Sequence, residues 1–208
     1  MILESFPTGP FQANCTLMGD EESGQAVIVD PGDEAGRIAR RVSELGLTLQ
    51  AILLTHAHLD HAGGAAQLRK LTGAPVLLHP ADLPLLESMA EQAAWMGLEA
   101  PEVHPPNGEL AEGQIVGLER FPARVISTPG HTKGSCCFYL EAEGLLIAGD
   151  TLFAGGIGRT DLPGGNYEEI MASLYQRLMK LPDGTKVICG HGGGTTIGRE
   201  RRTNPFLR

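Results

Sequence analysis

The chain has 208 residues, of which 42% are hydrophobic and 20% are charged, and these proportions are ordinary for a globular protein. Its net charge of −9 argues against non-specific binding to nucleic acid or to an anionic membrane surface. No apolar run is long enough to span a bilayer, and the first residues lack the basic and apolar regions of a signal peptide. We therefore expect no nucleic-acid partner and no membrane partner. The oligomeric state stays open.

Strands and helices alternate along the first half of the chain. Short apolar runs predict strands over residues 2–6, 14–18, 25–29, 51–54 and 76–78. Helical spacing predicts helices over 33–45, with Asp33 as the N-cap, over 62–71 and over 81–98. The proline-rich and acidic segment 99–113 indicates a loop.

The second half repeats this order of elements without repeating the sequence. Strands are predicted over 115–118, 124–127, 135–140, 145–148 and 186–189. A helix is expected to start at Asn166, with Glu169 completing a pair that resembles a capping box. No linker divides the chain, so we expect a single domain over residues 1–208, built from two sheets covered by helices.

Four cysteines are present, and none of them forms a CxxC motif. Cys136 and Cys137 are adjacent in a predicted strand, so their side chains should face opposite sides of the sheet. We expect Cys15, Cys189 and this pair to be small buried thiols, which is consistent with a reducing cytoplasm.

The segment from Thr55 to His61 holds three imidazoles and one carboxylate, and it directly follows the predicted strand 51–54. A hydrophobic core has no use for four such groups together. Imidazole nitrogen and carboxylate oxygen are ligands for zinc, iron or manganese, and one metal ion takes three or four protein ligands. Because further candidates follow downstream, the sequence predicts two metal ions. The four side chains are those of His56, His58, Asp60 and His61.

Three further candidate ligands each follow a predicted strand and lie beside a glycine. They are His131, Asp150 and His191. Glycine lets the backbone turn sharply and approach a neighbour closely, so a single shared site at one edge of the sheets is expected. We expect the remaining histidines, His79 and His104, to be ordinary structural or surface residues.

This pattern of histidines and aspartates resembles the metallo-β-lactamase superfamily over nearly the whole chain. The resemblance implies an α/β (α+β) fold, a four-layer αββα sandwich with a binuclear site at its edge. It implies that His56, His58 and His131 hold one metal, that Asp60, His61 and His191 hold the other, and that Asp150 bridges them. By the same resemblance Asp30 is a carboxylate that supports the ligands from behind.

Other segments are similar to particular branches of this superfamily. Typical zinc β-lactamases place Cys where this chain has Asp150. Residues 130–134 and 149–153 resemble glyoxalase II, the hydrolase of S-2-hydroxyacylglutathione. Residues 158–165 resemble the persulfide dioxygenases and a short bacterial glyoxalase II-like group, and residues 195–206 resemble that short group. The chain ends soon after His191, so we expect no separate C-terminal helical domain of the glyoxalase II kind.

The resemblance implies a metal-dependent hydrolase that cleaves a small-molecule thioester, and the cysteine pattern and the first residues favour a cytoplasmic location. Two divalent metal ions are expected, zinc first, with iron and manganese as alternatives. A metal-bridging hydroxide would attack the thioester carbonyl, and Asp60 would orient that hydroxide as the catalytic carboxylate. Arg159 is the candidate for binding a substrate carboxylate, and its alternative role is an ion pair with Asp161.

Two other functions compete with this one. An iron-dependent persulfide dioxygenase would use a face of two histidines and one carboxylate, such as His56, His131 and Asp150. A non-enzymatic binding module would use its metals only for stability. Structural zinc sites are closed and four-coordinate, whereas seven donors for two metals leave room for water and substrate, so the binding module is disfavoured.

Overall fold

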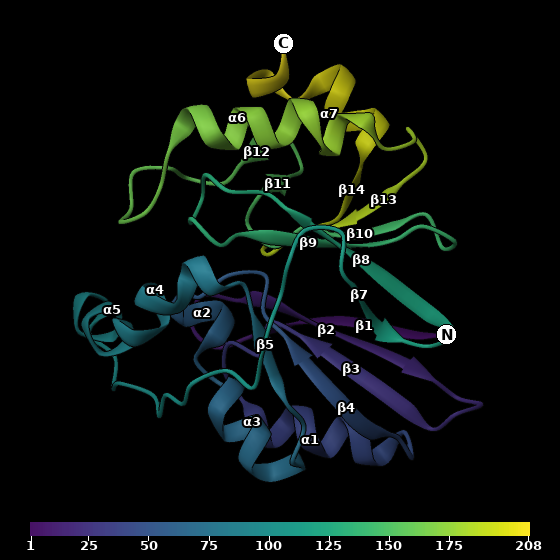
Figure 1. The fold of residues 1–208 in the computed structure, drawn as a ribbon, viewed down its shortest axis with the longest axis vertical. Coiled ribbons are helices and arrows are strands. Elements are labelled where there is room, and N and C mark those ends of the chain that lie inside the picture. Colours follow the sequence, from purple (N-terminus) through teal and green to yellow (C-terminus); the bar gives the residue numbers. More distant parts are fainter.

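The computed structural model describes residues 1–208 as two facing six-stranded sheets with helices on both outer faces (Figure 1). The first sheet has the strand order β1-β2-β3-β4-β5-β6. Its strands are β1 (Ile2–Thr8), β2 (Ala13–Asp20), β3 (Gln25–Val29), β4 (Thr48–Leu53), β5 (Val76–Leu78) and β6 (Gly108–Glu109). The β1–β2 and β2–β3 pairs are antiparallel, and β3 to β6 run parallel.

The second sheet has the order β14-β13-β10-β9-β8-β7. Its strands are β7 (Ile115–Leu118), β8 (Phe121–Ser127), β9 (Cys136–Leu140), β10 (Leu145–Ile147), β13 (Lys186–Ile188) and β14 (Thr195–Thr196). A separate small hairpin consists of β11 (Leu152–Phe153) and β12 (Gly156–Ile157).

Helices form the two outer layers (Figure 1). The first sheet is covered by α1 (Ala35–Glu44) and α3 (Ala65–Thr72), and the second by α6 (Tyr167–Gln176) and α7 (Ile197–Thr203). Shorter helices lie at one end of the sandwich or close the chain: α2 (Leu59–Ala62), η1 (Pro80–Asp82), α4 (Leu83–Glu87), α5 (Met89–Met96), η2 (Leu178–Lys180) and η3 (Pro205–Leu207). None of these helices has the length and hydropathy needed to cross a membrane.

Three separate apolar cores lie between the four layers. One joins α1 and α3 to the first sheet, one lies between the two sheets, and one joins the second sheet to α6 and α7. Cys136 belongs to the core between the sheets and Cys137 to the core beneath α6, as strand alternation predicts. This layering confirms the predicted αββα sandwich.

Helix α1 begins one residue later than predicted. Asp33 is not the N-cap. That position belongs to Glu34, which has a left-handed backbone with φ of 55°. Glu34 Oε1 accepts a hydrogen bond from Gly9 N, and Glu34 Oε2 lies 2.7 Å from Arg37 Nη1. Asp33 instead accepts a bond from the Glu34 amide. The contact with the β1–β2 loop therefore overrides the local capping preference of aspartate.

Two predicted helices differ in the structure. The helix predicted over 62–71 is α3, which begins three residues later, at Ala65, and the short α2 precedes it, because the loop after β3 packs against Gly63 and Gly64. A Cβ atom on Gly64 would lie 2.5 Å from Pro31 O, so only glycine fits there. The 81–98 helix is split into η1, α4 and α5, and Ser88 Oγ donates to Leu85 O at the break before α5. Hydrophobic spacing alone does not register such breaks.

Asn166 caps α6 as predicted, because its side-chain oxygen accepts hydrogen bonds from the amides of Glu168 and Glu169. The return bond of a capping box is not made. The Asn166 amide donates instead to Gly130 O, in the loop that carries His131. The start of α6 thereby supports one of the predicted ligand loops.

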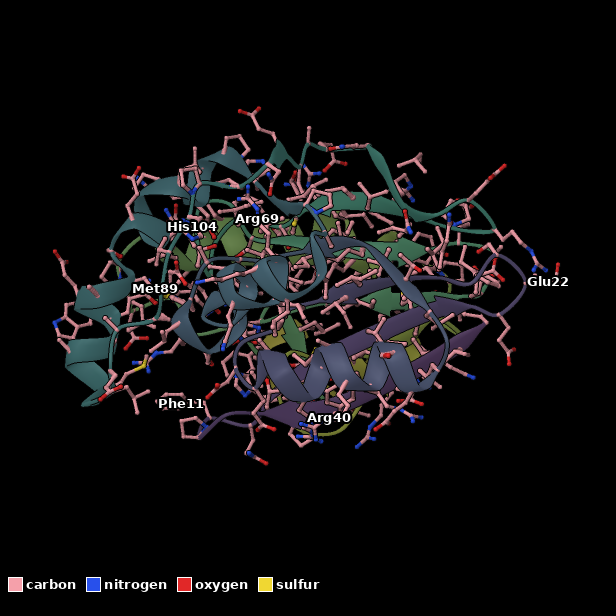
Figure 2. The ribbon with its side chains drawn as sticks, turned by 90° about the horizontal axis from the view of Figure 1, so that it is seen from below. Phe11, Glu22, Arg40, Arg69, Met89 and His104 are labelled. Carbon is pink, nitrogen blue, oxygen red and sulfur yellow. The ribbon has the colours of Figure 1, made fainter.

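The loops that carry the predicted ligands gather at one end of the sandwich. Figure 2 places Phe11, in the β1–β2 loop, and Met89 at this end, and Glu22, in the β2–β3 turn, at the opposite end. Backbone contacts connect the two sheets here, since Cys136 N donates to Thr55 O and Asn14 N donates to Gly190 O. The site therefore lies on the rigid ends of strands from both halves of the chain.

Candidate metal centre

The seven predicted ligands converge at this end, although they come from four loops. The loop after β4 and the short helix α2 carry the first four, and the loops after β8, β10 and β13 each carry one. They are His56, His58, Asp60, His61, His131, Asp150 and His191. His56, His61 and His131 are each no more than 2% exposed.

Three histidines form one group of possible metal ligands. One nitrogen each of His56, His58 and His131 lies within 4.8 Å of the others, and His58 Nδ1 is 2.9 Å from His131 Nε2. A second group consists of Asp60, His61 and His191. Asp60 Oδ2 is 3.1 Å from His191 Nε2, which in turn is 3.2 Å from His61 Nε2.

Asp150 lies between these two groups. Its Oδ1 atom is 3.3 Å from His61 Nε2, and its Oδ2 atom is 3.6 Å from His131 Nε2 and 3.7 Å from His191 Nε2. The backbone behind it is closely packed, because a Cβ atom on Gly190 would lie 2.0 Å from Asp150 Oδ1. One carboxylate therefore faces donors of both groups.

Four of the five histidines point Nε2 into the cluster and bond Nδ1 outward. His131 Nδ1 donates to Arg159 O at 2.8 Å, and His191 Nδ1 donates to Phe11 O at 3.1 Å. Carbonyl oxygens only accept, so these bonds place the proton on Nδ1 and the lone pair on Nε2. Such outward bonding is the usual arrangement behind metal-binding histidines.

Asp30 and Thr55 orient the other two histidines. Thr55 Oγ1 donates to Asp30 Oδ2 at 2.6 Å and lies 3.0 Å from His56 Nδ1, which therefore donates to it. His61 Nδ1 donates to the same Asp30 oxygen at 3.0 Å, and Asp30 Oδ1 accepts from Thr55 N. The carboxylate of Asp30 therefore supports two histidines from behind, as the resemblance implies. Its left-handed backbone, with φ of 53°, is unusual for a residue other than glycine.

Asp82 is a supporting residue that the sequence analysis missed. It is 1% exposed, and its carboxylate joins the two principal ligand loops. Oδ2 accepts from Ala57 N at 3.0 Å and from Thr132 Oγ1 at 2.8 Å, and Oδ1 accepts from Gly134 N at 2.6 Å. Ala57 lies between two ligand histidines, and Thr132 follows His131. The only local signal was an aspartate in a stretch expected to be helical.

Burial and mutual repulsion keep several of the imidazoles neutral. Burial, followed by the nearby His61 and His131, lowers the pKa of His56 well below its ordinary value. Burial and His131 lower the pKa of His58 to about 4. His61 behaves differently, because Asp150 and Asp30 outweigh burial and raise its pKa well above the ordinary value. Neutral imidazole is the form that binds a metal ion.

Two polar atoms in the cluster have no hydrogen-bond partner. They are His56 Nε2 and Asp150 Oδ1, and both are buried and face the other donors. An unpartnered buried polar atom is costly unless another group satisfies it. A lone pair on nitrogen and a carboxylate oxygen can both be satisfied by a cation, so the residues fit divalent metal ions.

The two remaining histidines lie outside the cluster, as expected. His79 Nδ1 accepts a hydrogen bond from Ala81 N and caps η1. His104 is exposed, and its Nε2 atom is 3.0 Å from Glu102 Oε1.

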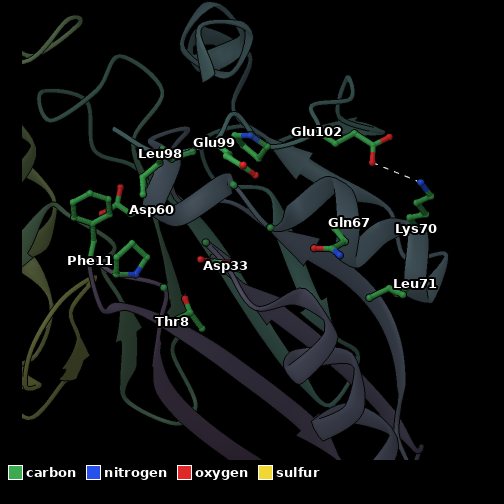
Figure 3. Close-up of a pocket in the computed structure, with 17 residues that line it drawn as sticks. Thr8, Phe11, Asp33, Asp60, Gln67, Lys70, Leu71, Leu98, Glu99 and Glu102 are labelled. Carbon is green, nitrogen blue, oxygen red and sulfur yellow. Dashed lines mark ion pairs between the residues drawn. The ribbon is translucent and has the colours of Figure 1, made fainter. Parts of the chain in front are cut away.

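Two cavities adjoin the cluster. The cavity of about 750 Å³ that Asp60 lines is called the Asp60 cavity, and Figure 3 shows Phe11 and Leu98 near this carboxylate. The cavity of about 330 Å³ that His58 lines is called the His58 cavity, and Trp95 and Met96 contribute to its wall. A substrate can therefore reach the donor set from outside.

The model of the metallo-beta-lactamase superfamily matches residues 8–191. The chain belongs to this superfamily. A relative from Haemophilus influenzae named hydroxyacylglutathione hydrolase GloC is 43% identical, with 100% of this chain and 98% of the relative aligned. Membership and the donor set together identify the chain as a metal-dependent enzyme of the metallo-hydrolase type.

Three solved structures of this superfamily closely match the fold. BLEG-1, a B3 metallo-beta-lactamase, superposes with a TM-score of 0.92 at 37% identity and covers 99% of both chains. TTHA1623 in a di-iron-bound form gives 0.90 at 43% identity, covering 98% of this chain and 100% of its own. ETHE1 from Myxococcus xanthus gives 0.83 at 31% identity, covering 99% of this chain and 84% of its own.

Proposed function

We propose that this protein hydrolyses a small-molecule thioester of the S-2-hydroxyacylglutathione kind. The observation that supports it is the cluster itself. Seven donors converge there, and the Nδ1 atoms of four of its histidines are hydrogen-bonded to the surrounding protein. The relative named hydroxyacylglutathione hydrolase GloC, 43% identical over the full chain, supports the substrate class.

Two divalent metal ions would occupy the two groups of donors. His56, His58 and His131 would hold one ion, Asp60, His61 and His191 would hold the other, and Asp150 would bind both. Once bound, such a pair supplies an acidified water and polarises a carbonyl oxygen. Zinc is our first choice. Iron is supported by the similarity to the di-iron-bound TTHA1623, and manganese fits the same nitrogen and oxygen donors.

Asp60 is the residue that orients the attacking water. Its Oδ2 atom contacts His191, and its carboxylate lines the Asp60 cavity. Burial works to raise the pKa of Asp60, but the hydrogen bond from His191 and the neighbouring His61 lower it overall, so the group is an anion that accepts a hydrogen bond. The water oxygen would form the new C–O bond at the carbonyl carbon and the C–S bond would break, which gives a carboxylate and a thiolate and releases the two protons of the water. Since a thiol has a pKa near 8.5, this step needs little help from a general acid.

Arg159 would bind a carboxylate of the thiol carrier. In the structure its guanidinium makes a two-point ion pair with Asp161, with N–O distances of 2.8 and 2.7 Å. Both side chains are more than half exposed, and exposed pairs of this kind contribute at most about 1 kcal/mol to stability. A carboxylate of the substrate can therefore replace Asp161 at small cost.

Substitution of Arg159 by alanine tests this role. We expect Arg159→Ala to raise KM for glutathione thioesters roughly tenfold, the loss of about one charge-assisted hydrogen bond, with kcat little changed. Asp161→Asn is the matched control, because it frees the guanidinium and should leave KM equal or lower. An unchanged KM of Arg159→Ala for every thioester tested would show that Arg159 only anchors its loop.

Hydrolysis of S-D-lactoylglutathione by the metal-loaded protein tests the function itself. Product formation should depend on the metal and should be lost with a chelator. A cephalosporin serves as the comparison substrate because of the similarity to BLEG-1. If fully metallated protein turns over no thioester, the proposal fails.

An iron-dependent persulfide dioxygenase is the second candidate. The similarity to ETHE1 from Myxococcus xanthus favours it, as does the sequence around Arg159. It would need one iron on His56, His131 and Asp150. Oxygen uptake by the iron-loaded protein with glutathione persulfide, without thioester hydrolysis, would establish it in place of the hydrolase.

A further inference from the structure

The two cavities beside the cluster differ in charge. Four carboxylates line the Asp60 cavity, and its one cation, Lys70, lies 3.7 Å from Glu102 in an ion pair (Figure 3). Asp60 would bind a metal ion and Glu102 is paired with Lys70, so Asp33 and Glu99 are the acidic groups that disfavour an anionic thiol carrier there. Arg159, the proposed partner of the carrier carboxylate, lines neither cavity. If Arg159 binds the carrier carboxylate, that carboxylate would lie outside both linings, which leaves the His58 cavity free for the acyl half of the substrate.

Most of the surface of the His58 cavity is apolar, although polar side chains also line it. Leu85, Met96 and Leu162 contribute to its wall together with Trp95. Trp95 is 70% exposed although it is a large apolar side chain. An indole that is exposed at the wall of a cavity costs free energy in the free protein. A ligand that covers the indole removes this cost and therefore binds more tightly.

Gln92 fixes this wall to the ligand loop. Its Oε1 atom accepts from Leu59 N at 2.9 Å, and its Nε2 atom donates to Leu85 O at 2.8 Å and to Ala57 O at 3.2 Å. Trp95 follows Gln92 by three residues on α5, so its backbone position is fixed relative to the ligand loop. The wall is therefore preformed and does not need to fold around the substrate.

We propose that the His58 cavity binds the acyl group of the thioester and selects an apolar acyl group of about the size of a phenyl ring. This inference rests on the proposed function and specifies its substrate. The volume of about 330 Å³ accommodates such a group together with the neighbouring carbonyl. Of the charged side chains in the lining, Glu91 and Lys133 are exposed, and the carboxylate of Asp82 is already bonded to the ligand loops.

Two glutathione thioesters that differ only in the acyl side group test the inference. S-D-mandeloylglutathione carries a phenyl ring where S-D-lactoylglutathione carries a methyl group. The wild-type protein should favour the mandeloyl ester in kcat/KM by about tenfold or more, since burial of a ring gains more than burial of a methyl group. Trp95→Ala should reduce that preference at least fivefold, and Trp95→Phe should largely keep it.

Leu98→Ala is the matched control, because Leu98 is an exposed apolar residue that lines the Asp60 cavity instead. It should leave the preference unchanged. Equal losses on both esters in Trp95→Ala, no preference in the wild-type protein, or a lost preference in Leu98→Ala would each overturn the acyl assignment.

Fluorescence provides a second readout that does not depend on turnover. Trp95 is the only tryptophan of the chain, so its emission reports on this cavity alone. Titration of metal-loaded Asp60→Asn protein with the mandeloyl ester should give a saturable emission shift, and the lactoyl ester a much smaller one. If the wild-type protein hydrolyses neither ester, the proposed function fails. If it hydrolyses both equally and the emission does not change, only the acyl assignment fails.

Discussion

Replacement of Asp60 by asparagine will lower kcat for thioester hydrolysis by about 100- to 10,000-fold, while the protein stays folded. Asparagine has nearly the same size, so the packing around α2 is retained. Its neutral amide has lost one acceptor oxygen and the negative charge that His191 and His61 now face. The attacking water would lose its partner. The measurement is kcat at saturating substrate and saturating metal.

The control for Asp60→Asn is Glu99→Gln. Glu99 also lines the Asp60 cavity, but it belongs to neither group of donors, so its substitution should leave kcat within about twofold. Elemental analysis of the metal content distinguishes two causes of a lower kcat: loss of a metal ion, or loss of the carboxylate that orients the attacking water. Turnover close to that of the wild-type protein in fully metallated Asp60→Asn would refute the role of this carboxylate.

Asparagine in place of Asp82 will weaken metal binding roughly 10- to 100-fold, although Asp82 is in neither group of donors. Burial raises the pKa of Asp82, and the bonds from Thr132, Gly134 and Ala57 oppose that rise. Asparagine cannot accept from Gly134 N and from the Ala57 and Thr132 donors together, because one of its two terminal atoms is a donor. At least one buried N–H would then lose its partner, and the two ligand loops would move apart.

The same substitution should lower the free energy of unfolding by about 2 kcal/mol, or roughly 4–8 °C in Tm, as measured on metal-free protein. Metal affinity is measured by competition with a chelating dye, well below Tm, so that unfolding does not contribute. Asp161→Asn is the control for metal binding, since this exposed aspartate contacts neither ligand loop through its carboxylate. An Asp82→Asn protein with wild-type metal affinity would show that Asp82 serves stability alone.

The candidate ligands were readable from the sequence because each sits in a local pattern. Four are packed into one short segment, and His131, Asp150 and His191 each follow an apolar strand and lie beside glycine. Two sheets covered by helices were also accessible, since apolar runs and helical spacing are local properties, while the αββα sandwich was implied by the family resemblance. The helix end at Gly63–Gly64 was not, because contacts with the distant loop after β3 require glycine there, and the break at Ser88, where Ser88 Oγ bonds Leu85 O, has no signature in hydrophobic spacing.

The way those ligands are held, and the groups that they face, depend on tertiary contacts. The acceptors behind His131 and His191 are backbone carbonyls of Arg159 and Phe11, and a backbone carbonyl has no signature in a sequence. Asp82 acquires its role only because the fold brings two loops to its carboxylate. Residue type fixes the chemistry of the donors, because it sets which atoms can bind a metal. Long-range packing determined their tautomers, their supports and the two cavities, because those depend on residues far apart in the chain.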